Sequence, residues 1–148
     1  MKRLALLLVA LLVAGTATEL YSQRPSRRHF KRGGAAATLP FSDAVLAGNT
    51  LYLAGRLGVD ASGRIPDDLE QEIRNIMESM KTALADAGMT PDDLVSVQVF
   101  CPDLTLYGKF NDIYRTYFKQ DFPARAFIGS GPLLRGAHFE VQGIAVKP

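Results

Sequence analysis

The stretch Asp67–Gly88, DDLEQEIRNIMESMKTALADAG, decides the fold class of this chain. Its large apolar residues recur at intervals of three and four, the spacing of one face of an amphipathic helix. They are Leu69, Ile73, Ile76, Met77, Met80 and Leu84. Asp67, followed three residues later by Glu70, resembles a capping box, and Gly88 is a typical stop signal. We therefore predict a helix over this stretch.

Two short apolar runs precede this helix. Ala44–Ala47 and Leu51–Leu57 are joined through Gly48-Asn49, a dipeptide that suits a tight hairpin turn. A second turn sequence, DASGRIP at 60–66, separates the second run from the helix. We expect the two runs to pair as an antiparallel hairpin.

Three further strands and a second helix are predicted after the first helix. The valines of 95–99 alternate with polar residues, which indicates a strand with one buried face. A helical period returns over 106–118 and ends before Pro123, and two strand-like runs follow at 124–128 and 138–146. The order β-β-α-β-α-β-β predicts an α+β domain, most simply one sheet with both helices packed on one face.

Composition and charge fit one small domain over residues 39–148. The chain has 148 residues, of which 47% are hydrophobic and 22% are charged. Residues 1–32 hold seven of its 17 Lys and Arg but one of its 15 Asp and Glu, so the net charge of +2 becomes −4 over residues 33–148. A mildly acidic domain argues against nucleic acid as a partner.

The N-terminal sequence MKRLALLLVALLVAGTATE has the pattern of a secretory signal peptide over residues 1–17. A basic pair precedes the apolar run Leu4–Val13, and Gly15 and Ala17 supply the small residues of a cleavage site. A retained membrane anchor is the alternative, although about ten apolar residues fall short of the ~20 that a spanning helix needs. We expect cleavage, no stable anchor afterwards, and a periplasmic or secreted protein.

Residues 18–38 are predicted to form a basic flexible tether. They show no apolar period, and they contain Pro25, Gly33 and Gly34. Attraction of the arginines to anionic lipid or polymer near a membrane is an alternative role.

Few residues match a familiar reaction site. The two histidines, His29 and His138, do not form a pair at metal-ligand spacing, and we expect neither a metal nor a cofactor. Cys101 continues an apolar alternation and is interpreted as a buried structural thiol. The sequence GSGP at 129–132 lacks the lysine and the following helix of a phosphate-binding loop.

The stretch FPARAFIGSG, Phe122–Gly131, places Arg125 in the middle of an apolar strand. If the last two runs form an antiparallel hairpin, one register sets Arg125 opposite Glu140. One interpretation is a cross-strand salt bridge worth ~1 kcal/mol or less. The other is an anion site, in which Arg125 is a two-pronged donor to a carboxylate. The residue types alone favour the salt bridge.

Three blocks of sequence resemble the RidA/YjgF family over residues 39–146. They are LPFSDAVLAGNTLYLAGRL at 39–57, NDIYRTYF with DFPARAF at 111–127, and LLRGAHFEVQGIAV at 133–146. The block FPAR, with a glutamate fifteen residues after its arginine, is the most specific feature. The resemblance implies a fold like that of the small trimeric chorismate mutases, a homotrimer, and ligand clefts between subunits.

The resemblance also implies an activity. Deaminases of this family hydrolyse reactive 2-imino acids, which pyridoxal-phosphate enzymes release, to 2-oxo acids and ammonia without a metal or cofactor. It implies that Arg125 holds the substrate carboxylate and that Glu140 positions the attacking water. Asn111 matches a residue of the same cleft, and Gly55 matches a glycine that lets the substrate lie against the backbone. An imine carbon is already electrophilic, so binding, orientation and one carboxylate acting on water suffice.

Several positions depart from the family pattern. Phe41 stands where tyrosine is usual, with Asp43 two residues on, and Ala54 stands where serine is usual. Phe127 replaces a small residue, often cysteine. Each lost hydroxyl can remove a hydrogen bond worth ~1 kcal/mol. Phe41 and Phe127 either line the ligand pocket or are plain core residues.

Three functions are therefore compared. The first is an exported homotrimeric deaminase of 2-imino acids, with Arg125 and Glu140 as its catalytic pair. The second is a binding module that captures a small carboxylate, such as a 2-oxo acid or an aromatic acid, without turnover. The third is the ribonuclease activity attributed to some relatives, which the acidic domain and the lack of a basic, aromatic strip weaken. We favour the deaminase.

N-terminal sequencing of the protein made in an export-competent host tests the signal peptide. We expect the mature chain to begin close to residue 18, because the small residues before it suit the peptidase. Soluble protein that still begins with Met1 would contradict the prediction.

Overall fold

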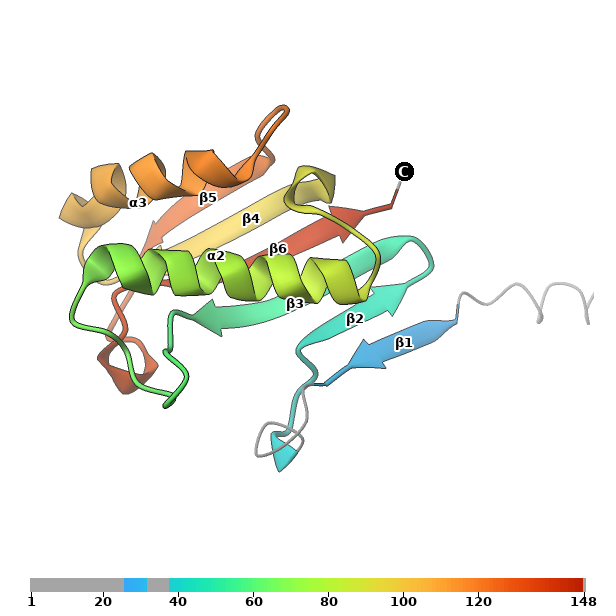
Figure 1. The fold of residues 1–148 in the computed structure, drawn as a ribbon, viewed down its shortest axis with the longest axis horizontal. Helices are drawn as coiled ribbons and strands as arrows, with labels where there is room; N and C mark the ends of the chain where they lie inside the picture. The colour runs from blue at the N-terminus through green and yellow to red at the C-terminus, as the bar shows by residue number, and fades with distance from the viewer. Residues whose placement is uncertain (1–25, 32–37, 148) are drawn as a thin grey trace, which may run out of the picture.

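The computed structural model describes residues 26–31 and 38–147 (Figure 1). The predicted signal peptide and most of the predicted tether lie outside the described residues. The strands are β1 (Arg27–Phe30), β2 (Ala44–Ala47), β3 (Thr50–Leu57), β4 (Leu94–Cys101), β5 (Ala124–Gly129) and β6 (Glu140–Val146), and the helices are α2 (Leu69–Asp86) and α3 (Tyr107–Tyr114). Short 3₁₀ turns occur at η2 (Pro91–Asp93), η3 (Leu104–Leu106), η4 (Arg115–Tyr117) and η5 (Leu134–Gly136).

The strands form one sheet in the order β1-β2-β3-β6-β4-β5. Helices α2 and α3, the α-helices of the described residues, lie on the same face of this sheet (Figure 1). The other face is called the open face below, because no described helix covers it. The predicted α+β class is confirmed. None of the described helices is long and apolar enough to cross a membrane.

Helix α2 buries the predicted apolar face. Ile73, Ile76 and Leu84 have no exposed surface, and they pack with core residues of the sheet. The helix begins one residue later than the capping box suggested, because the Asp68 side chain, rather than that of Asp67, accepts the hydrogen bond from the backbone of Glu70.

The predicted hairpin between β2 and β3 is also confirmed. Gly48 and Asn49 form a two-residue turn between the paired residues Ala47 and Thr50. Gly48 has φ of 62°, a left-handed conformation that glycine adopts without strain.

The hairpin predicted between the last two strands is wrong. Strand β6 lies between β3 and β4 and is antiparallel to both, whereas β5 is an edge strand that pairs in parallel with β4. Arg125 therefore aligns with Val97, and Glu140 aligns with Phe100, two different positions of β4. In the central position β6 gains backbone hydrogen bonds on both edges and buries Val141, an advantage that a terminal hairpin lacks.

The expectation of a flexible tether is wrong for Arg27–Phe30, which forms strand β1. This strand pairs with β2, and Phe30 packs against the core. The Arg28 guanidinium carbon lies 4.4 Å from the Phe30 ring centroid. Pairing at a sheet edge uses backbone groups, so the strand forms without an apolar alternation.

The second predicted helix is also shorter than expected, because the turns of η3 and η4 flank only eight α-helical residues.

The buried carboxylate of Glu72 connects α2 to the start of β6. Its Oε1 accepts hydrogen bonds from the backbone N–H groups of His138, at 2.8 Å, and Phe139, at 3.2 Å. The His138 ring nitrogen Nδ1 lies 2.7 Å from Oε2. Glu72 has no exposed surface, so these contacts replace its lost hydration. They fix the chain immediately before Glu140.

Removing the Glu72 carboxylate is expected to destabilise the fold. Glu72→Ala leaves the backbone N–H groups of His138 and of the buried Phe139 without this acceptor, so the free energy of unfolding in urea falls by about 3 kcal/mol. Glu72→Gln keeps one acceptor oxygen, and its loss is about half as large. Glu78→Ala, on the exposed face of the same helix, is the control and changes stability by about 0.5 kcal/mol or less. Equal losses for Glu72→Ala and Glu78→Ala would contradict this role.

Candidate functional site

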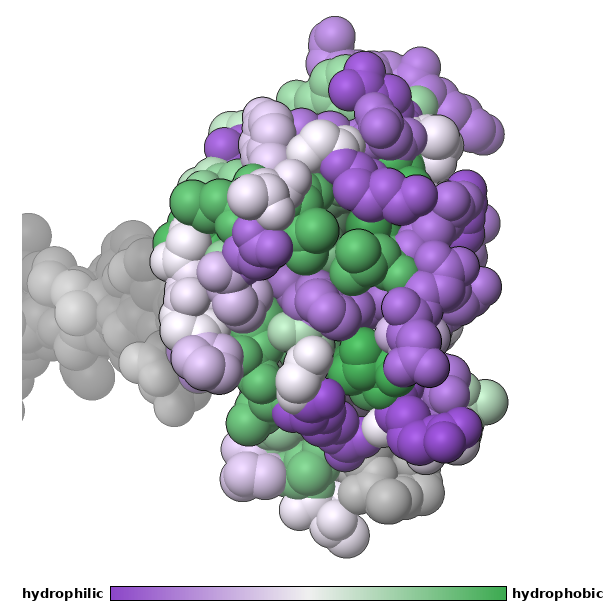
Figure 2. Space-filling view, turned by 90° about the vertical axis from the view of Figure 1, so that its left-hand side faces the viewer, coloured by the Kyte–Doolittle hydropathy of each residue, from purple (hydrophilic) through white to green (hydrophobic). Residues whose placement is uncertain are grey.

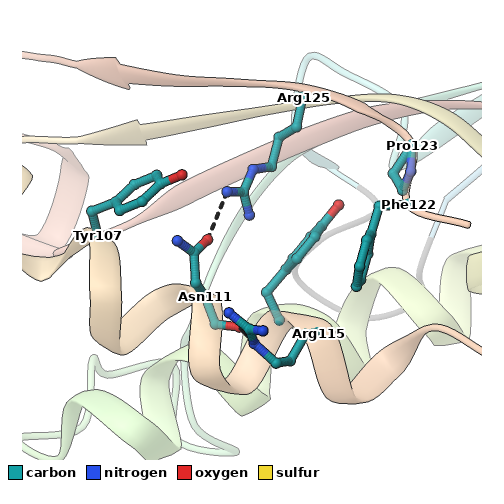
Figure 3. Close-up of a pocket in the computed structure, with 7 residues that line it drawn as sticks. Tyr107, Asn111, Arg115, Phe122, Pro123 and Arg125 are labelled. Atoms are coloured by element: carbon teal, nitrogen blue, oxygen red, sulfur yellow. Dashed lines mark hydrogen bonds between the residues drawn. The ribbon is translucent and has the colours of Figure 1, made fainter.

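A cavity of about 340 Å³ lies between helix α3 with its following turn η4 and the start of strand β5 (Figure 3). The residues that line it are Tyr107, Asn111, Tyr114, Arg115, Phe122, Pro123 and Arg125. Arg125 and Asn111 are therefore brought together as the resemblance implies.

Arg125 extends from β5 toward α3 and is half-buried (Figure 3). Its Nη2 donates a hydrogen bond of 2.6 Å to Asn111 Oδ1, and its guanidinium carbon lies 4.6 Å from the Tyr114 ring centroid. Among the residues that the structure describes, no carboxylate lies within ion-pair distance of it. The salt bridge with Glu140 that the residue types favoured is therefore absent within the described chain.

Aromatic rings surround the Arg125 guanidinium on several sides. Its central carbon lies 5.8 Å from the Tyr107 ring centroid and 5.9 Å from those of Phe110 and Phe127. The faces of the two phenylalanine rings attract the cation without using its N–H donors, whereas the Tyr107 side chain also interacts with Arg125 through a hydrogen bond. The guanidinium is thus held in place while most of its donors stay available.

Helix periodicity places three polar side chains of α3 beneath Arg125. Tyr107, Asn111 and Tyr114 are spaced by four and three residues, so they share one helix face. The helical period predicted over 106–118 starts before Tyr107 and runs past Tyr114, but it did not single out either tyrosine as a cavity residue, and Tyr114 is also part of the core. Arg115, Phe122 and Pro123 were also missed as lining residues, because the turn after α3 sets their directions and no sequence period does.

The two tyrosines of the cavity are perturbed in opposite directions. The side-chain hydrogen bond with Asn111 lowers the pKa of Tyr107, and the charge of Arg125 adds to this effect. Burial raises the pKa of Tyr114 to about 12, although Arg125 opposes the shift. The Tyr114 hydroxyl is buried and finds no hydrogen-bond partner among the described residues. Tyr114 is therefore neutral at physiological pH.

Glu140 lies on the opposite face of the sheet from Arg125. Val141, Gly143 and Ala145 face the helices, so the alternation of β6 turns Glu140 to the open face. A side-chain carbon on Gly55 would collide with Glu140 Oε1. Glycine at position 55 therefore lets the carboxylate lie against the backbone of β3.

The six predicted site residues lie in three separate places of one chain. Arg125, Asn111 and Phe127 meet on the helix side of β5, whereas Gly55 and Glu140 meet on the open face. Phe41, in the segment before β2, is 53% exposed. The expectation that Arg125 and Glu140 face each other is wrong within one chain.

Phe41 and Phe127, which were predicted either to line the ligand pocket or to be core residues, differ in burial within one chain. Phe127 packs against the core beside Phe110, at a centroid distance of 5.6 Å, and it does not line the cavity. Phe41 is too exposed in a single chain to be a core residue. Within one chain Phe127 is therefore a partly buried residue at the edge of the core and Phe41 is a surface residue, and a role of either in a cleft between subunits stays a prediction.

The open face of the sheet has a hollow of about 270 Å³ of its own. Its lining includes Tyr52, Gln98, Gln142 and Ile144, and Tyr52 is 50% exposed. Figure 2, an end-on view, shows most of the strongly hydrophilic residues on the helix side and paler or hydrophobic residues on the sheet side. The sheet side is thus less polar than the outer surfaces of the helices.

Cys101 and the potential metal ligands were compared with the predictions for the described part of the chain. Cys101 is buried, and burial raises the pKa of its thiol, so the predicted structural thiol is confirmed. Within residues 26–31 and 38–147, His, Cys, Asp and Glu do not cluster in groups of three that could hold a metal ion.

Comparison with known proteins identifies the family. The family described as Endoribonuclease L-PSP matches residues 33–147. The chain belongs to this family, the RidA/YjgF family. It is 35% identical over 114 residues to a 2-iminobutanoate/2-iminopropanoate deaminase of Bos taurus, covering 76% of this chain and 83% of that protein. It is 32% identical to the Homo sapiens protein of the same name, covering 73% and 80%.

Solved structures of RidA/YjgF relatives share the fold. The yjgF gene product of E. coli is 26% identical, with a TM-score of 0.76 over 82% of this chain and 99% of that one. A protein of unknown function from the Rid family, YyfA of Yersinia pestis, is 28% identical, with a TM-score of 0.77 over 82% and 100%. These similarities support the sheet order and the two-helix layer described above.

Proposed function

We propose that this protein is a deaminase that hydrolyses small 2-imino acids to 2-oxo acids and ammonia. The observation that carries the proposal is Arg125, a half-buried cation with no carboxylate partner in the described chain, at the wall of a cavity of about 340 Å³. The names of the bovine and human relatives support the same substrate class. We further propose that the enzyme acts outside the cytoplasm once residues 1–17 are removed.

Arg125 is suited to bind the carboxylate of the substrate. A guanidinium presents parallel N–H donors that match both oxygens of a carboxylate, and such charge-assisted pairs are stronger than neutral hydrogen bonds. Asn111 and the surrounding rings hold the guanidinium before the ligand arrives, which lowers the entropy lost on binding. Arg125 therefore contributes mainly to affinity.

The reaction then requires one proton acceptor. Glu140 takes a proton from a water molecule as its oxygen forms a bond to the imine carbon, and the electrons of the C=N bond move to nitrogen. Glu140 returns this proton to nitrogen, which completes the carbinolamine. It then takes the proton of the carbinolamine hydroxyl and passes it to the amino group, so the C–N bond breaks, ammonia leaves and the C=O bond of the 2-oxo acid forms. A positioned general base contributes about 10²–10⁴-fold in rate, so Glu140 contributes mainly to turnover.

Because Arg125 and Glu140 lie on opposite faces of one sheet, we propose that they meet between subunits of a homotrimer. Arg125 with Asn111 would come from one subunit, and Glu140 with Gly55 from its neighbour. The less polar open face of the sheet supports packing against another copy (Figure 2). A head-to-tail interface of this kind closes into a ring when the rotation is one third of a turn.

A non-catalytic binding module is the second candidate. The cavity around Arg125 contains no carboxylate among its described lining residues, so a single chain offers an anion site without a base. Ala54 also lacks the hydroxyl that is usual in the deaminases. This chemistry would retain a small 2-oxo or aromatic acid without converting it.

The roles of the two residues can be separated by kinetics on 2-imino acids generated in situ by an amino-acid oxidase. Arg125→Ala is expected to raise KM and to weaken the binding of 2-oxobutyrate about 10- to 100-fold, since a charge-assisted pair is lost. Glu140→Gln is expected to lower kcat by about 100-fold or more with little change in that binding. Arg74→Ala, an arginine on the outer surface of α2, is the matched control.

Two outcomes would reject these proposals. Wild-type protein that binds 2-oxobutyrate through Arg125 but does not accelerate imine loss would reject the deaminase and leave the binding module. Unchanged binding and rate in Arg125→Ala would reject both.

Mixing the two impaired variants tests the shared site. In randomly mixed trimers of Arg125→Ala and Glu140→Gln chains, about a quarter of the interfaces combine an intact arginine with an intact glutamate from the neighbour. At a substrate concentration below KM, we expect about 25% of wild-type activity after co-refolding at equal amounts, against about 1–10% from either variant alone. Activity in mixed trimers, as verified by native mass spectrometry, that stays at the level of the separate variants would contradict a site built from two subunits.

A further inference from the structure

A second arginine lines the same cavity as Arg125. Arg115 is the first residue of η4, directly after α3, and Figure 3 shows its side chain turned back along the helix toward Asn111. Its Nε donates a hydrogen bond of 3.1 Å to the backbone carbonyl of Asn111. The same residue holds Arg125 through its side-chain oxygen at 2.6 Å. Asn111 thus orients both guanidinium groups.

The described part of the cavity carries no negative charge to balance the two arginines. The other lining residues are uncharged side chains: Tyr107, Asn111, Tyr114, Phe122 and Pro123. Among the described residues, neither guanidinium has a carboxylate within ion-pair distance. Two cations on one cavity repel each other, and a ligand with two negative charges relieves this repulsion.

The position of Arg115 at the end of a helix suggests a simpler role, in which it only caps the last carbonyls. A cation there does interact favourably with the helix dipole. The hydrogen bond to Asn111, however, uses Nε alone, and the terminal nitrogens make no hydrogen bond to the described residues. A guanidinium with these donors available can still bind a carboxylate through two oxygens.

We infer that the preferred substrate is a 2-imino dicarboxylate. The carboxylate beside the imine binds Arg125, and the second carboxylate binds Arg115, with the neutral rings of Tyr107 and Phe122 beside the connecting carbons. This inference rests on the proposed deaminase function and specifies its substrate class. Arg115 is a specificity-determining residue in this account, and the hydrolysis step is unchanged.

The expected preference is modest because Arg115 is exposed. An exposed ion pair is weakened by solvent and salt, so we expect the second carboxylate to improve binding about five-fold at low ionic strength. The same preference should shrink as salt is added, whereas binding through the half-buried Arg125 should change less.

Calorimetric titration of the full-length protein with 2-oxoglutarate and 2-oxobutyrate tests this preference. Wild-type protein is expected to bind the dicarboxylate about five-fold more tightly. Arg115→Gln should remove this difference, mainly by weakening the binding of 2-oxoglutarate, and should weaken the binding of 2-oxobutyrate much less, because its single carboxylate binds Arg125. Lys109→Gln, which removes a positive charge from α3 outside the cavity, is the matched control and should keep the preference.

Rates with the imines of glutamate and 2-aminobutyrate separate failure of this inference from failure of the proposed function. If 2-iminobutanoate is hydrolysed but Arg115→Gln affects both ligands alike, or neither, the dicarboxylate inference is overturned and the deaminase stands. If neither imine is consumed but the preference for 2-oxoglutarate disappears in Arg115→Gln, the deaminase fails and the dicarboxylate site is supported. A loss of preference in Lys109→Gln equal to that in Arg115→Gln would also overturn the inference. It would indicate that the positive charge of this region, rather than contact with Arg115, favours the dicarboxylate.

Discussion

The hydrogen bond between Arg125 and Asn111 is the interaction on which the proposed site depends. A guanidinium in a half-buried position has lost part of its hydration and requires compensation. The described chain supplies one amide oxygen at 2.6 Å and several aromatic rings, but no carboxylate within ion-pair distance. Most of the donor capacity of Arg125 is therefore free to bind an anion that enters the cavity.

The strand order of the sheet determines where Glu140, the proposed catalytic base, lies relative to an anion bound to Arg125. Because β6 lies between β3 and β4, strand β4 separates Glu140 on β6 from Arg125 on β5. The two side chains also point to opposite faces of the sheet. Glu72 fixes the chain just before Glu140, and Gly55 gives the carboxylate room on the open face. One chain is thus consistent with an anion-binding site, and catalysis in our proposal requires a second chain.

Local patterns predicted much of this arrangement. The apolar period of α2, the Gly48-Asn49 turn and the buried face of β4 follow from neighbouring residues, and each was found where expected. Arg125 stood out because a cation interrupts an apolar strand. The family resemblance added Asn111, which helical spacing then places beneath the guanidinium.

The predictions that proved wrong or incomplete concern contacts between residues that are far apart in the sequence. Residue types allowed Arg125 and Glu140 to be paired in a hairpin, but β6 instead pairs with β3 and β4, and no pattern within these strands specifies that long-range order. Strand β1 pairs through its backbone and leaves no side-chain period to detect. Arg115 was missed because a single turn after α3 directs it to the cavity.

A crystal structure of the protein with bound 2-oxobutyrate would show whether Arg125 and Glu140 belong to one site. We expect the ligand carboxylate on the Arg125 guanidinium, with the ligand carbonyl carbon facing Glu140 of a neighbouring subunit. A structure in which Arg125 forms an ion pair with a carboxylate of the protein, with the ligand bound elsewhere or absent, would contradict it.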